Sequence, residues 1–241
     1  MRRFFIDKPA SIGMPHTIQG PDAKHIASVL RMKQGDTIGM FDGKGHTLMA
    51  RINAISPKAV QVTITDMLAF DTDSPVHITL GQALLKDKKM DGLVRQLTEL
   101  GISEWLPFET ERAVPDRNRM HVSQRIARWE SIARESLKQC ERGMLPRIHP
   151  PVSFDEVVDA AAAYDMGIIF TGNDTPALEK TAQPVSRILI LIGPEGGFTA
   201  GEIDHARAKG LIPAGMGPRI LKADTAAVAA CALVQHIFGD M

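Results

Sequence analysis

The chain of 241 residues has few cysteines, one tyrosine and no net charge. Cys140 and Cys231 stand far apart and form no CxxC pair, so the sequence indicates neither a disulfide framework nor a structural zinc site. The apolar runs, ILILI at 188–192 among them, are far too short to cross a bilayer, and the opening MRRFFIDKPA lacks the apolar stretch of a signal peptide. We therefore expect a soluble, cytoplasmic protein without a membrane partner.

Common nucleotide-binding and metal-binding signatures are also missing. Neither GxxxxGKS nor GxxxxGKT occurs, which excludes a P-loop. GxGxxG is also absent, so a nucleotide-dependent oxidoreductase is an alternative that no dinucleotide-binding motif supports. The eight histidines are scattered without HxxxH spacing, so we assign no metal. The hydrophobic content of 44% is ample for the buried core of one large domain or two modest ones.

The charges are unevenly distributed along the chain. Residues 1–147 hold 22 Lys and Arg against 17 Asp and Glu, a net charge of +5, whereas residues 148–241 hold 6 against 11, a net charge of −5. Although a difference of this size also arises by chance, it favours a basic N-terminal part that meets a polyanion and a C-terminal part with another task.

The first 70 residues predict short strands separated by turns. Asp42-Gly43 stands between strand-like runs, which is a strong hairpin signal, and Pro21-Asp22 predicts a short helix that ends near Arg31. This pattern is typical of a small β-barrel, which we place at residues 1–72. The polar segment DTDSP at 71–75 predicts a connection between domains. The predicted strands are TIGMF, HTLMARINAI and AVQVTITDMLAF.

From residue 76 onward, strands and helices alternate. Gly101 stands where the helix KKMDGLVRQLTEL should end, and the pairs Ser153/Glu156 and Thr199/Glu202 have the spacing of capping boxes. The alternation predicts an α/β domain at 73–241, with a parallel sheet covered on both faces. Small side chains in the last helix, DTAAVAACALVQHIF, favour close packing against another element or subunit. The remaining predicted strands are VHITLGQALL, EWLPF, DMGIIF, RILILIG and LIPAGM, and a long helix is predicted over HVSQRIARWESIARESLKQC.

Two glycine-containing loops follow successive predicted strands near the C-terminus. RILILI runs into Gly193-Pro194-Glu195-Gly196-Gly197, and LIPAGM runs into the segment 215–218. Glycines at the carboxyl ends of parallel strands let the backbone approach a ligand closely. We expect the two strands to be adjacent, so that the loops form a pocket instead of plain turns. The late position of the first loop leaves too few strands for a dinucleotide fold that begins at its glycine loop.

IGPEGGFTAGEID followed by GMGPRILKADTAAVAA resembles the paired C-terminal motifs of SPOUT-class RNA methyltransferases, specifically the bacterial 16S rRNA uracil-N3 methyltransferase family. The resemblance extends over nearly the whole chain. It includes RRFF, HIASVLRMKQGDTIGMFDG, KKMDGLVRQLTELGI, FETER and WESIARESLKQCERGMLPRI. It implies a PUA-like, RNA-binding barrel and a SPOUT domain tied in a deep trefoil knot, which binds S-adenosylmethionine and forms a homodimer. The implied substrate is 16S rRNA within the assembled small ribosomal subunit.

The charged residues in and near the two loops are the candidates for the chemistry, and the resemblance adds the cofactor-binding residues. Glu195 is the candidate to accept or orient the uracil N3 proton, although it can instead satisfy loop amides. Arg219 is the candidate to hold a phosphate or to stabilise charge on a uracil oxygen, with a surface salt bridge as the alternative. Asp224 is expected to cap the last helix. The implied cofactor-binding residues are Phe170, Thr171, Ile192, Gly193, Glu195, Gly196, Met216, Gly217, Ile220, Leu221 and Thr225. The implied RNA-binding residues are Arg2, Arg3, Arg31, Lys33, Arg112 and Arg142.

The sequence departs from the usual family pattern in three places. Lys222-Ala223-Asp224 stands where Arg, a variable residue and Glu are common, and Gln96 occupies a position that is often lysine. The run Lys138-Gln139-Cys140-Glu141-Arg142 replaces a more typical Glu-Gln-Ser-Gly-Arg. This last change reverses a charge and loses a glycine.

Two alternative functions keep the fold. One is methylation of another RNA acceptor, such as a ribose 2′-hydroxyl or a different base, and the other is that of an RNA-binding assembly factor without catalysis.

Overall fold

The structure is a computed structural model that describes residues 2–8, 10–68, 72–86, 89–113, 122–172, 175–179 and 184–241. It divides into two compact units. The first comprises Met1–Asp73 and Arg134–Leu145, and the second comprises Ser74–Ala133 and Pro146–Met241. The chain therefore passes from the first unit to the second at the polar segment 71–75 and briefly returns to the first unit at residues 134–145.

The first unit is built on a five-stranded sheet with the order β1-β3-β4-β5-β2. β1 pairs with β3 in parallel, and the other neighbours are antiparallel. Asp42 confirms the hairpin between β3 and β4, because its carboxylate accepts hydrogen bonds from the backbone amides of Lys44 (2.8 Å) and His46 (3.2 Å). The strands are β1 (Arg3–Phe5), β2 (Pro15–Gln19), β3 (Thr37–Phe41), β4 (Thr47–Ile55) and β5 (Ala59–Leu68).

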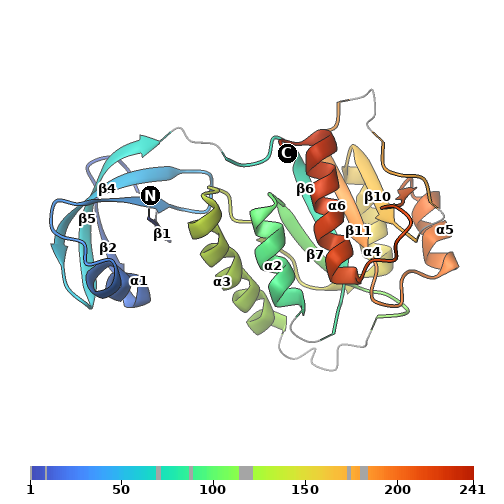
Figure 1. Cartoon of the computed structure of the whole chain (residues 1–241), viewed down its shortest axis with the longest axis horizontal. Coiled ribbons are helices and arrows are strands. Elements are labelled where there is room, and N and C mark those ends of the chain that lie inside the picture. Colours follow the sequence, from blue (N-terminus) through green and yellow to red (C-terminus); the bar gives the residue numbers. More distant parts are fainter. Residues whose placement is uncertain are drawn as a thin grey trace. The chain divides into compact units, whose positions relative to one another are not determined.

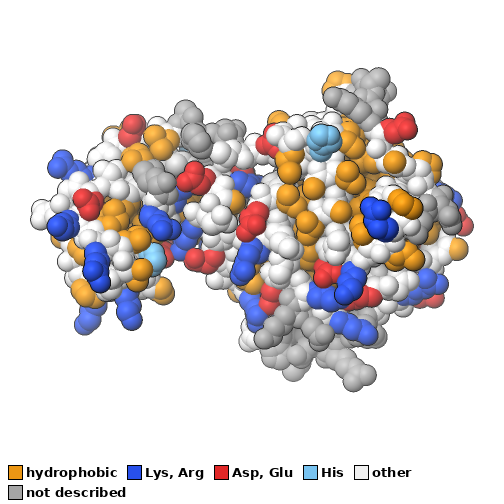
Figure 2. Space-filling model, in the orientation of Figure 1, with side chains coloured by type: hydrophobic (Ala, Val, Ile, Leu, Met, Phe, Trp, Pro, Cys, Tyr) orange, Lys and Arg blue, Asp and Glu red, His pale blue; other side chains and the backbone are white. Residues whose placement is uncertain are grey.

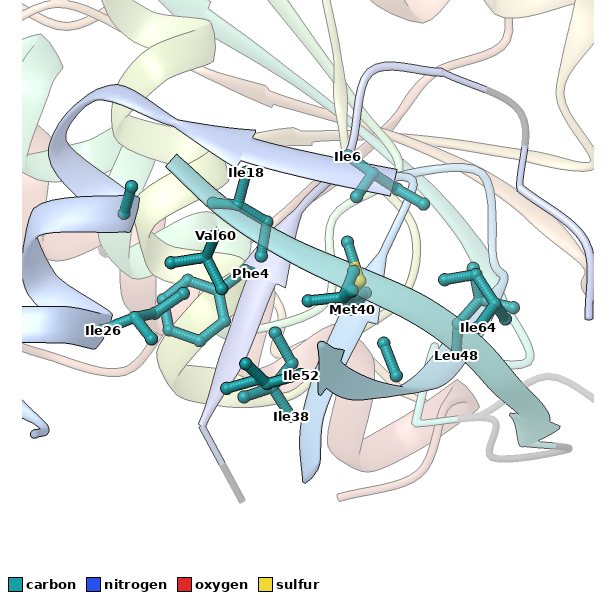
Figure 3. Packing of buried hydrophobic residues seen from close by; sticks show 13 residues of the cluster. Phe4, Ile6, Ile18, Ile26, Ile38, Met40, Leu48, Ile52, Val60 and Ile64 are labelled. Atoms are coloured by element: carbon teal, nitrogen blue, oxygen red, sulfur yellow. The ribbon is translucent and has the colours of Figure 1, made fainter. Parts of the chain in front are cut away.

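Aliphatic side chains fill the space enclosed by this curled sheet (Figure 3). Ile38, Ile52 and Val60 come from three different strands and are almost fully buried. The predicted short helix is present as α1 (Gly20–Lys24), which continues into a π-helical turn, η1 (His25–Val29). Ile26 on this turn completes the core, and Arg31 follows it with a positive φ of 52°.

Residues after helix α3 (Val122–Cys140) are fixed in the first unit by buried charges. The Nε atom of Arg142 lies 2.7 Å from Oδ1 of Asp73, and these side chains are 5% and 15% exposed. Arg3 donates to the carbonyl oxygens of Glu141 and Arg142 and to the hydroxyl of Thr47. Both arginines are therefore internal parts of this unit.

The second unit confirms the predicted parallel sheet. Its seven strands follow the order β12-β10-β11-β6-β7-β8, with β9 paired to β7, and every pair is parallel. β11 is buried beyond its first residue, Arg187, as expected for a central strand covered on both faces. The strands are β6 (His77–Ala83), β7 (Glu104–Glu109), β8 (Arg147–Ile148), β9 (Val152–Ser153), β10 (Met166–Phe170), β11 (Arg187–Ile192) and β12 (Ile212–Ala214).

Helices cover both faces of this sheet (Figure 1). α4 (Phe154–Asp159), followed by the 3₁₀ turn η3 (Ala160–Ala163), packs with α5 (Ala200–Ala208) around an aromatic cluster on one face. α2 (Lys89–Glu99) packs against α6 (Ala223–Phe238), which also contacts β6 and β11. None of the helices in the described parts of the chain is both long and apolar enough to cross a membrane.

The helix ends follow the sequence signals with one exception. Both predicted capping boxes are present, at Ser153 and at Thr199. Gly101 ends α2 with a positive φ of 86°. The expected cap at Asp224 is wrong, because the N-cap of α6 is Lys222, whose side chain makes no capping hydrogen bond. Asp224 is instead the second residue of the helix, within its first turn.

Candidate functional site

A pocket of about 690 Å³ lies at the carboxyl edge of the parallel sheet. It is formed where three strands end. β11 leads into the first glycine loop, β12 leads into the second, and β10 contributes Phe170 and Thr171. The expectation that β11 and β12 are adjacent is wrong, because β10 lies between them and pairs with both. The two loops nevertheless face one pocket, since all three strands run in the same direction.

The first loop, residues 193–198, depends on its glycines. A Cβ atom at Gly193 would lie 3.2 Å from two carbons of the Phe198 ring. Gly197 has a φ of +67° and donates its amide to the carbonyl oxygen of Pro194 at 2.9 Å, which closes a tight turn. The loop ends at the capping box of α5. Only glycine leaves room for both this packing and backbone access from the pocket.

The second loop, residues 215–221, is held from behind by the segment that follows β10. The amide of Gly215 donates to the carbonyl oxygen of Pro176 at 2.8 Å, and a Cβ atom at Gly215 would lie 2.4 Å from the carbonyl oxygen of Thr175. Gly217 has a φ of +93°. Beyond it, the side chain of Ile220 is 89% exposed and forms part of the pocket wall.

The pocket gathers nearly all residues that the sequence assigned to cofactor binding. Thr225 is the exception, because it lies exposed in the first turn of α6 and is not among the lining residues. Both catalytic candidates, Glu195 and Arg219, line the pocket. The sequence-assigned residues found in the lining are Phe170, Thr171, Ile192, Gly193, Glu195, Gly196, Met216, Gly217, Arg219, Ile220 and Leu221.

Other lining residues were missed by sequence reasoning. Phe198 and Ile203 stand on either side of the capping box at Thr199, in the positions of a hydrophobic staple, so the cap spacing was a signal for them. Lys222, Ala223 and Ala226 lie within the second motif, beside the assigned Leu221 and Thr225, so that motif was a signal for them. The further lining residues are Gly172, Pro194 and Gly197.

Two cations contact the first glycine loop from outside. Nζ of Lys89, at the start of α2, lies 2.9 Å from Oε1 of Glu195. Arg112 donates from Nη1 to the carbonyl oxygens of Gly196 (3.1 Å) and Phe198 (3.4 Å). Burial raises the pKa of the Glu195 carboxyl, but hydrogen bonds from Lys89 and from backbone amides outweigh it and hold this pKa below its ordinary value. Glu195 is therefore ionised at neutral pH.

The opposite wall of the pocket carries Arg219 and Lys222, both exposed. In the part of the chain that the structure describes, Arg219 forms no ion pair, so its guanidinium is available to an anionic ligand. Among the lining residues described here, Glu195 is the single acidic side chain. The pocket thus combines one carboxylate with a cationic opposite wall.

The candidate RNA-binding residues fall into two classes. Arg2, Arg31 and Lys33 are exposed in the first unit, whereas Arg112 is exposed in the second, beside the glycine loop. Arg3 and Arg142 are buried and bonded within the first unit. For these two residues RNA contact stays a prediction, while the geometry gives them a structural role.

The pocket fits S-adenosylmethionine in size and chemistry. Its volume lies within the range of small-molecule sites, roughly 300 to 1,000 Å³. Apolar side chains such as Ile192, Phe198 and Leu221 can contact an adenine ring, and the glycine backbone offers amides and carbonyls for its polar edge. Among the described residues, no group of three or more His, Cys, Asp or Glu is arranged to hold a metal ion.

Comparison with known proteins agrees with this geometry. Residues 72–235 match the family model of an RNA methyltransferase domain, and residues 18–65 match that of an RNA methyltransferase PUA domain. Ribosomal RNA small subunit methyltransferase E from Buchnera aphidicola (Acyrthosiphon pisum) is 31% identical, over 99% of this chain and 94% of its own. The enzyme of the same name from Synechocystis is 31% identical, over 92% and 73%.

Solved structures are similar over the whole chain. Ribosomal RNA small subunit methyltransferase E from Neisseria gonorrhoeae, bound to S-adenosylmethionine, superposes with a TM-score of 0.91 at 29% identity and covers 100% of this chain and 99% of its own. A methyltransferase from Legionella pneumophila in complex with the same cofactor gives 0.86 at 30% identity, over 99% and 98%. Together with the match to the PUA domain model, these structures confirm the PUA-like first domain, while the trefoil knot stays a prediction. Because the RNA methyltransferase domain matches residues 72–235, which is more than half of the chain, the chain belongs to that family of RNA methyltransferases.

Proposed function

We propose that this protein uses S-adenosylmethionine to methylate N3 of a specific uridine in the 16S rRNA of the small ribosomal subunit. The observation that carries the proposal is the pocket, in which two glycine loops and a third strand end offer backbone to a ligand beside the Glu195 carboxylate and the Arg219 guanidinium. Three of the similar proteins named above are ribosomal RNA small subunit methyltransferases, and two similar structures contain this cofactor.

The cofactor, when bound, supplies an electrophilic methyl group on its sulfonium sulfur. The protein must therefore mainly align this methyl group with the acceptor nitrogen, and ordering two reactants contributes on the order of 7 to 11 kcal/mol to lowering the barrier. Gly193, Gly196 and Gly217 hold the cofactor through their backbone, and Ile192 and Leu221 provide apolar contacts. Thr225 keeps its proposed cofactor contact from the first turn of α6.

Glu195 is the proposed proton acceptor. N3 of uracil carries a proton that must leave as the N–C bond forms, while the C–S bond breaks and its electron pair stays on sulfur. The Glu195 carboxylate takes this proton and later releases it to water. A positioned base typically adds roughly 10²- to 10⁴-fold to the rate, so this contribution is secondary to alignment.

Arg219 is the proposed contact to the target nucleotide. Its free guanidinium on the pocket wall can hold the nucleotide's phosphate or stabilise negative charge on a uracil oxygen. N3 lies on the Watson–Crick edge of the base, so the uridine must be unpaired or splayed out to reach the pocket. Arg112, exposed beside the first glycine loop, is placed to contact the neighbouring backbone of the RNA.

The remaining parts of the assembly are also proposals. We assign RNA binding to residues 1–72, with Arg2, Arg31 and Lys33 as exposed contacts, and cofactor binding to residues 73–241. We further propose a deep trefoil knot in the second domain, a cytoplasmic location and the assembled small subunit as substrate.

A homodimer is the proposed quaternary structure. α6 carries no Asp, Glu, Lys or Arg between Asp224 and Asp240, and its Val228, Ala229, Ala232 and Leu233 are only half-buried in one chain. Figure 2 shows hydrophobic side chains gathered over this helix. Such a face of small apolar residues suits close packing with the same helix of a second copy.

Mass spectrometry of rRNA from cells with and without the gene tests the activity. We expect a methylated uridine in 16S rRNA that disappears on deletion, together with a reverse-transcription stop, because N3 methylation blocks Watson–Crick pairing. Loss of a ribose methyl group or of a different base modification would instead establish another acceptor. Calorimetry with S-adenosylmethionine separates the non-catalytic alternative, since a protein that only assists assembly need not bind the cofactor.

A further inference from the structure

The ion pair between Lys89 and Glu195 joins α2 to the rim of the pocket. Lys89 is the first residue of α2 and lies outside the pocket lining, while Glu195 is carried by the first glycine loop. Each side chain is 35% exposed. Ion pairs with this exposure contribute at most about 1 kcal/mol to stability, so stability gives a weak reason for placing a lysine here.

The orientation of Glu195 gives a stronger reason. A glutamate on an exposed loop has several accessible rotamers, and a charge-assisted hydrogen bond of 2.9 Å selects one of them. The glycine loop itself is fixed by its turn at Gly197 and by Arg112. The loop holds the backbone of Glu195, and Lys89 holds its carboxylate, so this side chain keeps one position at the pocket.

Building on the proposed function, we infer that Lys89 is a positioning residue for methyl transfer, which holds the Glu195 carboxylate ionised and oriented toward the acceptor base. Lys89 acts through Glu195 and takes no part in cofactor binding. Its chemistry requires a permanent positive charge within hydrogen-bond distance of a carboxylate, which arginine also supplies.

The charged groups around Glu195 determine the direction of the expected pH effect. Lys89 faces it from α2, Arg112 lies on the carbonyls of its own loop, and Arg219 and Lys222 stand on the opposite wall. Loss of Lys89 removes the strongest side-chain contribution that lowers the pKa of Glu195, so this pKa rises. Because the ionised form accepts the proton, the acidic limb of the rate profile moves to higher pH.

The test compares kcat as a function of pH for wild-type protein, Lys89→Met and Lys89→Arg. We expect Lys89→Met to lower kcat about tenfold near neutral pH, to shift the acidic limb upward and to leave the Kd for S-adenosylmethionine within about twofold. Lys89→Arg should restore the limb. Lys209→Met is the matched control, since Lys209 forms an exposed ion pair with Asp159 at 2.6 Å and should change neither quantity.

Three outcomes overturn the inference. An unchanged acidic limb and kcat in Lys89→Met would show that Lys89 does not position the carboxylate, and equal loss in the Met and Arg variants would show that charge is not what matters. A large loss of cofactor affinity in Lys89→Met would show that Lys89 acts through cofactor binding and not through the position of the base. Glu195→Gln separates the proposed function, because full activity in that variant removes Glu195 from the reaction whatever Lys89 does.

Discussion

At the scale of single residues, Glu141 stands out because its backbone is left-handed. Its φ is +65°, and its carbonyl oxygen accepts hydrogen bonds from Arg3 and from the Thr72 hydroxyl, which fix this conformation. The left-handed conformation costs a residue with a Cβ atom roughly 1–2 kcal/mol of free energy and costs glycine little. The usual family pattern has glycine at this position, so the departure noted in the sequence carries a backbone cost.

Replacing Glu141 by glycine and by alanine measures that cost. Both variants lose the carboxylate and keep the carbonyl, so the difference between them reports the backbone alone. We expect Glu141→Gly to be more stable than Glu141→Ala by about 1 kcal/mol in chemical denaturation. Equal stability of the two variants would show that the loop relaxes at no cost.

Gly215 and Gly92 provide a contrast between a required and a dispensable glycine. A Cβ atom at Gly215 meets the Thr175 carbonyl at 2.4 Å, whereas one at Gly92, exposed in α2, meets nothing within 4 Å. We expect Gly215→Ala to cost about 1–3 kcal/mol and to weaken S-adenosylmethionine binding, because the second loop must shift. Gly92→Ala should stabilise the protein by about 0.5–1 kcal/mol and leave cofactor affinity unchanged. Thermal unfolding and calorimetry on the two variants check this, and unaltered cofactor binding in Gly215→Ala would contradict it.

The contribution of sequence reasoning at this scale differs from residue to residue. Glu195 and Gly217 were assigned to the pocket through their motifs, and both line it. The partner of Glu195 was not foreseen, because Lys89 lies 106 residues earlier and no local pattern joins the two. The burial of Arg3 and Arg142, which were assigned to RNA binding, was not foreseen for the same reason, since it depends on contacts between distant segments.

At the scale of elements, the two capping boxes have the same chemistry and different neighbours. Thr199 caps α5 at the end of the first glycine loop, whereas Ser153 caps α4 away from the pocket lining. We expect Thr199→Ala and Ser153→Ala each to cost about 1 kcal/mol of stability, because each leaves a first-turn amide without its acceptor. Only Thr199→Ala should also lower affinity for S-adenosylmethionine.

Denaturant titrations with calorimetry on both variants measure the two effects separately. A similar loss of cofactor affinity in Ser153→Ala would mean that general destabilisation, and not the loop, controls binding. A loss in neither variant would show that the loop keeps its shape without the cap. The two variants can be compared because both helices begin with the same capping box, in which Ser or Thr is followed three residues later by Glu.

The elements with clear periodicity were predicted from the sequence, whereas several of the shortest strands were not. α2 was recognised from the spacing of its buried Met90, Leu93 and Leu97, and β11 from its continuous apolar run. β1, β8 and β9 have three residues or fewer, too few to show a period. Strand order was also beyond local pattern, because the insertion of β10 between β11 and β12 is a property of the whole sheet.

At the scale of the whole molecule, the uneven charge and the last helix, which carries no Asp, Glu, Lys or Arg after Asp224, belong to different tasks. The basic excess of residues 1–147 suits a polyanionic RNA, and the acidic excess of residues 148–241 lies in the part that carries the pocket. α6 contributes little to either excess of charge. Its half-buried outer residues are apolar, and an unpartnered apolar stripe of this kind is costly for a chain that stays alone in water.

A single charge on α6 therefore tests the proposed dimer. We expect the wild-type protein to have twice the 26.3 kDa mass of one chain in light scattering, and Ala229→Glu to have the mass of one chain, because two carboxylates would meet across a symmetric contact. Ala208→Glu, at the exposed end of α5, is the matched control and should stay dimeric. If Ala229→Glu keeps the doubled mass, another surface forms the dimer; if the wild-type protein already has the mass of one chain, the apolar stripe of α6 serves another contact.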